Sequence, residues 1–256
     1  MKYLYLLTIV ALVAILSGAS RADWGDPIKW SQNQLDEWLA PSYIDPDMLT
    51  TPQSADDFLC TETGYITDIH FWGLCLHDAQ LSNDKVTGFR VSFYGDVPKS
   101  NNDASHPGDL LWRKDFGTGV YQYLGSSEWR INIPQADWFL QQGSRMDPMV
   151  YWIGIQGITE ANCYADRFYW RFRDHGAGSW NDDAAYCDNS QYPPWYNWGL
   201  QPGLDDPQRY DGLLPDGWQS IDMAFELSGR PVPEPSSLLA LLSGLGFAGA
   251  MWRRKK

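Results

Sequence analysis

Apolar and polar residues alternate with a period of two along most of the interior of the chain. In residues 65–76 the alternation places on one face Tyr65, Thr67, Ile69, Phe71 and Cys75, and on the other His70, Trp72 and Leu74. In residues 86–96 it separates Phe89, Val91 and Phe93 from Arg90, Ser92 and Tyr94. This period is typical of a β-strand with one buried face. The same reasoning predicts further strands at residues 110–116, 128–133, 150–158, 167–173 and 218–227.

Turn-forming residues separate these segments, and no long helix is expected between them. Gly, Pro, Asn and Asp gather in stretches such as residues 96–109, which read DVPKSNNDASHPGD. Residues 135–142 (QADWFLQQ) predict one short helical turn. We therefore expect an all-β domain, built as an antiparallel two-sheet sandwich with a jelly-roll-like order of strands.

Both ends of the chain depart from this pattern. Residues 1–22 combine Lys2, an apolar run and small residues, as a secretory signal peptide does, and we expect cleavage after Ala22, with Ala19 as the alternative. The last residues form an apolar run followed by a basic cluster, Arg253, Arg254, Lys255 and Lys256. The 17 residues from Ser236 to Trp252 would make a helix about 25 Å long, slightly short for a bilayer. The chain thus divides into a signal peptide (1–22), a folded domain (23–230) and a tail (231–256).

The tail resembles a bacterial sorting signal. Its triplet Pro233, Glu234 and Pro235, its apolar segment and its basic cluster are similar to the PEP-CTERM signal. The resemblance implies that a membrane-embedded exosortase removes this apolar sorting helix near the triplet and passes the protein to the cell surface or the medium. The basic cluster predicts a C-terminus that stays cytoplasmic while the domain crosses the inner membrane. The membrane is then a transient partner, and the alternative is a plain C-terminal anchor.

The exported part is strongly acidic. Residues 23–230 hold 13 Lys and Arg against 31 Asp and Glu, so their formal charge is −18. A surface of this charge repels nucleic acid and anionic lipid. We therefore expect no nucleic-acid partner. Solubility explains the charge, and binding of divalent cations is the sharper interpretation.

Four cysteines lie in the part of the chain that is routed to an oxidising compartment: Cys60, Cys75, Cys163 and Cys187. Two disulfides are the expected outcome there, because no Cys-x-x-Cys spacing indicates a metal site. Three pairings are possible. We favour the pairing of neighbours in sequence, Cys60 with Cys75 and Cys163 with Cys187, because short loops close most readily.

Motifs of common enzymes are absent from residues 23–230, which contain no His-Glu-x-x-His, Gly-x-Ser-x-Gly, P-loop or EF-hand sequence. A lone histidine on a strand, such as His70, is interpreted as a hydrogen-bonded framework residue. A glycoside hydrolase could still draw its two carboxyl groups from Asp56, Asp57, Asp182, Asp183 and Asp222. The pairs Asp56-Asp57 and Asp182-Asp183, the latter with Asn181, are better interpreted as turns at strand edges or as oxygen ligands of a structural Ca²⁺.

Aromatic residues offer a second kind of site. The chain has 14 Trp, and the segment 193–199 carries Trp195, Tyr196 and Trp198 among turn residues. Rings held on such a loop could stack on the apolar faces of sugars. The alternative is that Trp195 and Trp198 fold back and close one end of the sandwich, since most Trp surface in folded domains is buried.

The domain also resembles an uncharacterised exported domain of planctomycete-type bacteria. The similarity covers most of residues 28–227 and rests on the strings ADDFLC (55–60), ITDIHFWG (66–73), PGDLLW (107–112), YWIGIQ (151–156), WNDDAAY (180–186) and SIDMAF (220–225). It implies no established activity. We predict an exported, non-catalytic protein of the cell envelope or the medium that binds extracellular polysaccharide. A secreted glycoside hydrolase and a purely structural matrix protein are the alternatives, and the one cofactor considered is structural calcium.

Overall fold

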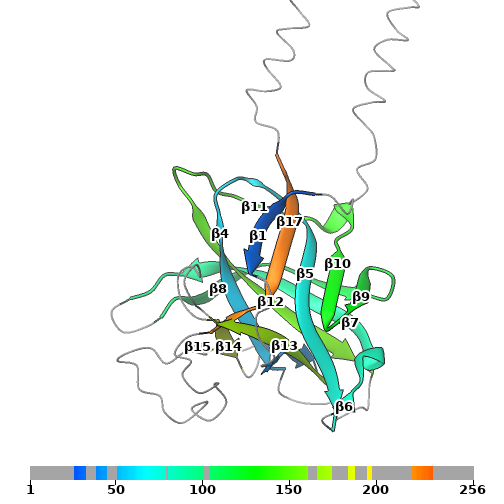
Figure 1. Cartoon of the computed structure of the whole chain (residues 1–256). Coiled ribbons are helices and arrows are strands. Elements are labelled where there is room, and N and C mark those ends of the chain that lie inside the picture. The colour runs from blue at the N-terminus through cyan, green and yellow to red at the C-terminus, as the bar shows by residue number, and fades with distance from the viewer. Residues whose placement is uncertain are drawn as a thin grey trace, which may run out of the picture.

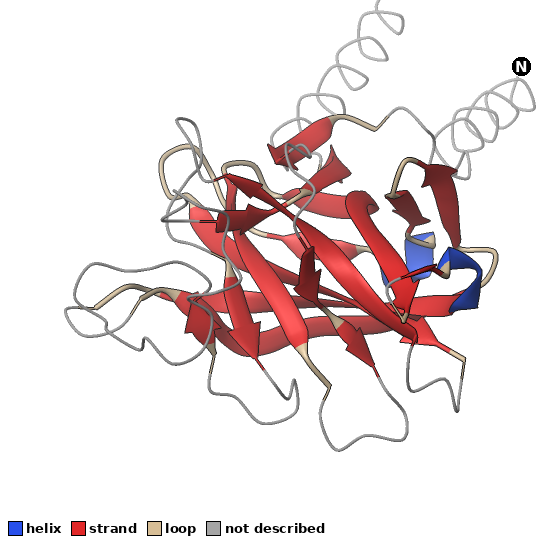
Figure 2. Ribbon diagram, turned by 60° about the horizontal axis from the view of Figure 1, so that its bottom comes forward, coloured by secondary structure: helices blue, strands red, loops and turns tan. Residues whose placement is uncertain are grey.

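The structure is a computed structural model that describes residues 26–32, 39–44, 51–78, 80–100, 104–160, 166–174, 184–187, 195–197 and 221–232. Within these ranges the chain forms two antiparallel sheets that pack face to face as a sandwich (Figures 1 and 2). Two short 3-10 turns accompany them, η1 (Asn83–Lys85) and η2 (Gln135–Asp137). The predicted fold class, an all-β sandwich, is confirmed.

The first sheet is built around β5 (Gly64–His77), a strand of 14 residues. Its N-terminal half pairs with β17 (Phe225–Pro231) on one side and with β10 (Glu128–Asn132) and β11 (Phe139–Gln141) on the other. Its C-terminal half pairs with β13 (Asp166–Asp174) and β6 (Gln80–Leu81). The sheet is completed by β1 (Ile28–Gln32), β2 (Leu39–Pro41), β9 (Tyr121–Gly125) and β16 (Ile221–Met223).

The second sheet has the strand order β15-β14-β4-β12-β7-β8. These strands are β15 (Tyr196–Asn197), β14 (Ala185–Cys187), β4 (Gln53–Cys60), β12 (Met149–Thr159), β7 (Val86–Val97) and β8 (His106–Gly117). The short β3 (Tyr43–Ile44) pairs with β12 in parallel, unlike the other pairs. β4 and β12 lie in the middle of the sheet, and most of their side chains are buried on both faces.

Aromatic rings fill the space between the sheets. Phe71 of the first sheet meets Phe89 of the second edge to face, with ring centroids 4.9 Å apart. Phe93 stacks on Phe139 at 4.3 Å. The indole nitrogens of two buried tryptophans have partners: Trp170 Nε1 donates to the carbonyl oxygen of Ala224 at 2.8 Å, and Trp129 Nε1 donates to that of Gly73 at 2.9 Å. Such edge-to-face and stacked pairs stabilise a core beyond the burial of their area.

The predicted alternation of β5 holds from Ile69 onward and fails before it. Ile69 and Phe71 lie in the core as expected, but so does Ile66, which has the opposite parity. The cause is a bulge, because the register with β17 shifts between Ser228 and Gly229 and leaves Thr67 without a paired residue there. One extra residue in a strand turns every side chain before it to the other face.

Two other segments differ from the prediction. Residues 53–60, in which no strand was expected, form the central strand β4. The single strand expected at residues 218–227 is two strands, β16 and β17, separated by Ala224. Residues 135–142 form the predicted helical turn, η2, and then the short strand β11.

The predicted bridge between Cys60 and Cys75 is wrong. The Cys60 thiol is free and donates a hydrogen bond to the carbonyl oxygen of Glu62 at 3.3 Å. Cys60 is four residues before the start of β5, and Cys75 is eleven residues beyond that start. Because a strand advances about 3.3 Å per residue, Cys75 lies roughly 35 Å along the sheet from the first residue of β5. The described residues contain no disulfide. Cys187 is buried in β14, but Cys163 lies outside the described ranges, and their bridge stays a prediction.

The segments expected to enter a membrane are not part of this description. Residues 1–25 and 233–256 lie outside the described ranges, and with them the signal peptide, Pro233, Glu234, Pro235 and the basic cluster. The described residues form no helix that is long and apolar enough to cross a bilayer.

Candidate functional site

Trp195 is the residue of the predicted glycan site whose side chain the structure describes. It precedes β15, and its half-buried ring packs on a small cluster made of Ala55, Tyr94, Trp152 and Ala185. We call these five residues the Trp195 cluster. The ring of Trp195 meets that of Tyr94 edge to face, with centroids 5.6 Å apart and planes at 77°.

Strand register explains why these residues share one face of the second sheet. Trp152 of β12 pairs with Tyr94 of β7 on one side and with Asp57 of β4 on the other. Ala55 of β4 pairs with Ala185 of β14. Directly paired residues lie on the same face of a sheet, and the neighbours of these residues in sequence, such as Phe93 and Ile153, belong to the core. The Trp195 cluster therefore lies on the outer face.

A layer of polar side chains surrounds the Tyr94 ring. The Tyr94 hydroxyl donates to Gln53 Oε1 at 3.0 Å and accepts from Arg113 Nη2 at 3.0 Å. Arg113 Nε donates to Ser92 Oγ, also at 3.0 Å. These bonds hold Arg113 and Gln53 in fixed positions beside the aromatic rings. The outer face thus combines rings with orientated donors and acceptors.

The side-chain amide of Gln53 has a donor that makes no hydrogen bond to a described residue. Its Nε2 is buried and has no acceptor among the described atoms. The amide lies over Gly154, where a Cβ would come within 1.9 Å of Nε2, so a larger residue at position 154 would displace it. A buried donor without an acceptor costs about 1–3 kcal/mol. Because Gln53 has no exposed surface, its amide braces Tyr94 within the sheet and does not meet a ligand directly.

The other predicted glycan contacts are only partly placed. The backbone of Tyr196 pairs with Tyr186 in the second sheet. Trp198, Asn181, Asp182 and Asp183 lie outside the described ranges. Sequence reasoning missed the residues that pack on Trp195 or are connected to it through the Tyr94 hydroxyl, namely Gln53, Ser92, Tyr94, Arg113 and Trp152. They come from four strands that are distant in sequence, and no local pattern links them.

We expected Asp56 and Asp57 in a turn at a strand edge, and this is wrong. They lie in the middle of β4 and have no exposed surface. Consecutive residues of a strand point to opposite faces, so the two carboxyl groups do not converge on one ion. In the described part of the chain, no group of three or more His, Cys, Asp and Glu side chains is placed to hold a metal. The proposed calcium ligands Asp182 and Asp183 are outside that part, so calcium binding stays a prediction.

The Asp56 carboxyl connects the two sheets. Its Oδ2 accepts from the backbone nitrogen of Met223 in β16 at 2.6 Å, and its Oδ1 accepts from that of Asp57 at 2.9 Å. Burial, and after it the charges of Asp222 and Asp57, raises the pKa of Asp56 well above its ordinary value. Since neither Asp56 nor Asp222 has exposed surface, this pair is a link within the core and has no access to a substrate.

His70 is held by carboxylates on both ring nitrogens, as a framework residue would be. Nδ1 lies 3.1 Å from Glu128 Oε1, and Nε2 lies 3.3 Å from Asp68 Oδ1. Arg130 Nε donates to the other oxygen of Asp68 at 2.6 Å. The hydrogen bond to Asp68 is the main cause that raises the pKa of His70, against the effect of burial. This cluster ties β5 to β10 on the outer face of the first sheet.

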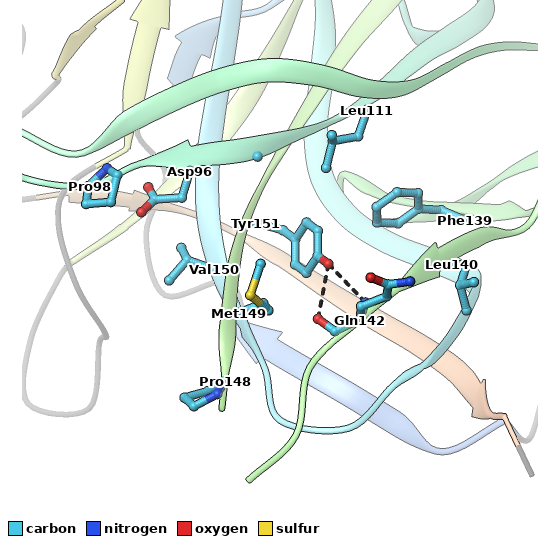
Figure 3. A pocket seen from close by; sticks show the side chains of 11 residues that line it. Asp96, Pro98, Leu111, Phe139, Leu140, Gln142, Pro148, Met149, Val150 and Tyr151 are labelled. Carbon is cyan, nitrogen blue, oxygen red and sulfur yellow. Dashed lines mark hydrogen bonds between the residues drawn. The ribbon is translucent and has the colours of Figure 1, made fainter. Parts of the chain in front are cut away.

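A groove with a volume of 660 Å³ opens at one end of the sandwich, between β7 and β8 on one side and β11 and β12 on the other (Figure 3). Its lining is mostly apolar, with Leu111, Phe139, Leu140, Met149, Val150 and Tyr151. Asp96 is the one carboxylate among the described lining residues, and it accepts from Trp152 Nε1 at 2.8 Å. The Tyr151 hydroxyl accepts from the backbone nitrogen of Gln142 and donates to its carbonyl oxygen. We call this feature the end groove.

Comparison with known families assigns both parts of the chain. Residues 28–228 match a family described as a domain of unknown function (DUF7901), and residues 231–255 match the PEP-CTERM protein-sorting motif. No curated protein and no solved structure matches the chain. The sorting motif marks an exported protein that exosortase processes, destined for the cell surface or the medium. The two resemblances seen in the sequence, a sorting tail and an uncharacterised domain, are thereby confirmed.

Proposed function

The chain belongs to the family described as a domain of unknown function (DUF7901), and we propose that its folded domain is a non-catalytic binding module whose ligand is extracellular polysaccharide. The contact site is the outer face of the second sheet around Trp195. The observation that carries the proposal is the position of the Trp195 ring, half exposed and braced on Tyr94 above a layer of fixed polar groups.

The chemistry of sugars supports this choice of site. One face of a sugar ring presents C–H groups and is apolar, while its rim carries hydroxyl groups. Trp195 offers an apolar surface for the face, and the half-buried guanidinium of Arg113, bonded to the Tyr94 hydroxyl, is the donor available for the rim. Because Tyr94 already holds the Trp195 ring, little conformational entropy remains to be lost on binding.

The placement of the acidic residues supports binding over hydrolysis. A glycoside hydrolase needs two carboxyl groups on opposite sides of the scissile bond, about 5–10 Å apart. Asp56, Asp57 and Asp222 have no exposed surface. The described lining of the end groove offers a single carboxylate, Asp96, whose oxygen is engaged by Trp152.

Substitution of Trp195 tests the proposal. We expect Trp195→Ala in the mature protein to abolish binding to the polysaccharide that the wild type retains, as measured by affinity electrophoresis over a panel of polysaccharides. The matched control is Trp138→Ala, which removes another half-buried ring, on the first sheet, where the Trp138 indole donates to Ile133 O. This control should keep the affinity of the wild type.

Thermal unfolding of the same variants separates a binding platform from a structural plug. A half-buried ring should cost about 1–2 kcal/mol when removed, whereas a ring that closes the sandwich should cost about 3–5 kcal/mol. Loss of stability in the larger range, with unchanged affinity, would assign Trp195 to the framework. Failure of the wild type to bind any polysaccharide would leave the structural matrix protein as the better account.

A further inference from the structure

The described part of the chain ends beside a loop that carries exposed apolar residues. The last strand among the described residues, β17, ends at Pro231, which pairs with Gly64. Val232 N then donates to the carbonyl oxygen of Thr63 at 3.3 Å. The side chain of Thr63 is bonded to the loop between β11 and β12, since its Oγ1 donates to Gly143 O at 2.9 Å and accepts from Gly143 N at 3.1 Å. One residue therefore joins the exit of the tail to this loop.

The loop, residues 142–148, is braced at both ends and presents its tip to solvent. Gln142 N is bound by the Tyr151 hydroxyl, and the backbones of Ser144 and Asp147 bond to each other in both directions. Met146, at the tip, is 95% exposed, and its neighbour Arg145 is exposed as well. A single exposed apolar residue is ordinary, but one on a braced loop beside other apolar surface indicates a contact.

That other apolar surface is the rim of the end groove. Leu140 and Met149 flank the loop on β11 and β12, both are exposed, and both line the groove (Figure 3). Val232, at the exit of the tail, is exposed too. We call Leu140, residues 142–148, Met149 and Val232 the tail-proximal end. In Figure 1 the strands β11, β17 and β1 lie together at this end, and β6 lies at the opposite one.

The length of chain between Val232 and the apolar run of the tail limits how far this end can be from a membrane. Six residues lead from Val232 to Leu238, which at full extension span about 20 Å. While the sorting segment is in the bilayer, the tail-proximal end must therefore lie at or close to the lipid headgroups.

We propose that the tail-proximal end rests on the lipid bilayer while the tail is inserted, with Met146 entering the interface. The contact orients the domain on the membrane before exosortase acts, so that the junction after Val232 is held at a fixed height. The domain as a whole carries a charge of −18, which opposes attraction to anionic lipid, so the contact is made by apolar side chains. It should consequently be insensitive to salt.

Fluorophores at two ends of the molecule test the contact in the full chain. We would make the chain in a host without exosortase, reconstitute it in phosphatidylcholine vesicles, and label Met146→Cys with an environment-sensitive dye. The matched control is Leu81→Cys, because Leu81 is 70% exposed and apolar but lies at the far end of β5. Wild-type chain treated with the dye reports any labelling of its own cysteines.

Quenching from the lipid and from water gives the result. Nitroxide-bearing lipids should quench the dye at position 146 several-fold more than the dye at position 81, iodide should do the reverse, and added salt should change neither. Equal lipid quenching at the two positions would refute the contact. A dye at position 146 that neither quencher reaches would also refute it, and would indicate that this end meets another protein or a second copy of the chain. Since glycan binding at Trp195 is not involved, failure here leaves the proposed function untouched.

Discussion

Asp56 carries a carboxyl group that is fully buried between the two sheets, in a layer packed with aromatic rings. Its two oxygens accept backbone hydrogen bonds from Met223 and Asp57, so the polar group is satisfied within the core. The hydrogen bond to Met223 joins β4 to β16, which belong to different sheets. An apolar residue at this position would leave the nitrogen of Met223 without its acceptor, at a cost of about 1–3 kcal/mol.

The raised pKa of Asp56 makes stability depend on pH. The folded protein binds the proton of the Asp56 carboxyl more tightly than the unfolded chain does. The contribution of this proton to the free energy of unfolding is therefore complete below the ordinary pKa of an aspartate, about 3.9, and is lost as the pH rises through the folded-state pKa. His70, whose pKa is also raised, acts in the same direction, but its contribution is lost only above about pH 6.5.

The variant Asp222→Asn should reduce this dependence, because the charge of Asp222 is the largest cause of the raised pKa of Asp56 after burial. We expect its free energy of unfolding to fall less than that of the wild type as the pH rises above about 4. Urea denaturation at a series of pH values measures the difference. Asp109→Asn, at an exposed position, is the control for loss of one carboxylate. Parallel curves for wild type and Asp222→Asn would contradict the assignment.

Among the elements, β12 and β5 approach the ring of Phe168 so closely that each has a glycine at the contact. A Cβ at Gly157 of β12 would lie 2.2 Å from the Cβ of Phe168, and one at Gly73 of β5 would lie 2.4 Å from the Cζ of its ring. Gly157 thus lets the backbone of β12 in the second sheet pack directly against Phe168 of β13 in the first sheet.

Substitution of Gly157 by alanine should therefore destabilise the sandwich, although alanine is normally favoured over glycine in a strand. We expect a loss of about 1–3 kcal/mol from overpacking. Gly117 of β8 is the matched control, because a Cβ there would meet nothing within 4 Å. Chemical denaturation of Gly157→Ala and Gly117→Ala makes the comparison. If both variants were as stable as the wild type, the close contact between β12 and Phe168 would be wrong.

The length of β5 also decides the pairing of the cysteines. Cys60 is the last residue of β4, four residues before β5 begins, and Cys75 lies near the far end of β5. We therefore expect peptide mapping without reduction to find Cys60 unlinked to Cys75. The bridge between Cys163 and Cys187 should be present in protein isolated after export, and its removal should cost about 2–4 kcal/mol. Recovery of a peptide pair joining Cys60 to Cys75 would overturn the arrangement of β4 and β5.

In the whole molecule, both ends of the described chain lie side by side. Gly229 N donates to Pro27 O at 3.0 Å, and β1 runs antiparallel to β17. The strand β17 ends at Pro231, which is also the first residue of the sorting motif at residues 231–255.

This arrangement allows a direct test of processing. We expect the exported protein to end near Pro235, because exosortase acts on the motif and the cut there leaves β17 intact. Intact mass of the protein recovered from a host that carries exosortase, compared with the same host without it, gives the result. Exported and correctly localised protein that still carried Arg253 to Lys256 would support a plain anchor instead.

Local patterns in the sequence were sufficient for most of the longer strands, though not for β4, and for the sorting tail. Alternation with a period of two is a property of neighbouring residues, and it located β7, β8, β10, β12 and β13. The tail could be interpreted from its own residues because a bilayer responds to length, apolarity and flanking charge, which are local as well. No tertiary contact was needed for either.

What the tertiary structure alone decided is burial and convergence. Asp56 and Asp57 look like turn residues in sequence, yet they pair with Ile153 and Trp152 of β12 and have no exposed surface, and Asp56 also accepts from the backbone of β16. The bulge at Thr67 turns part of β5 over, and it arises from the register with a strand about 160 residues away. The Trp195 cluster and the end groove likewise gather residues from separate strands. Such sites depend on pairing between segments that are distant in sequence. The contacts that stabilise this pairing are not visible in the hydrophobic pattern of any single segment.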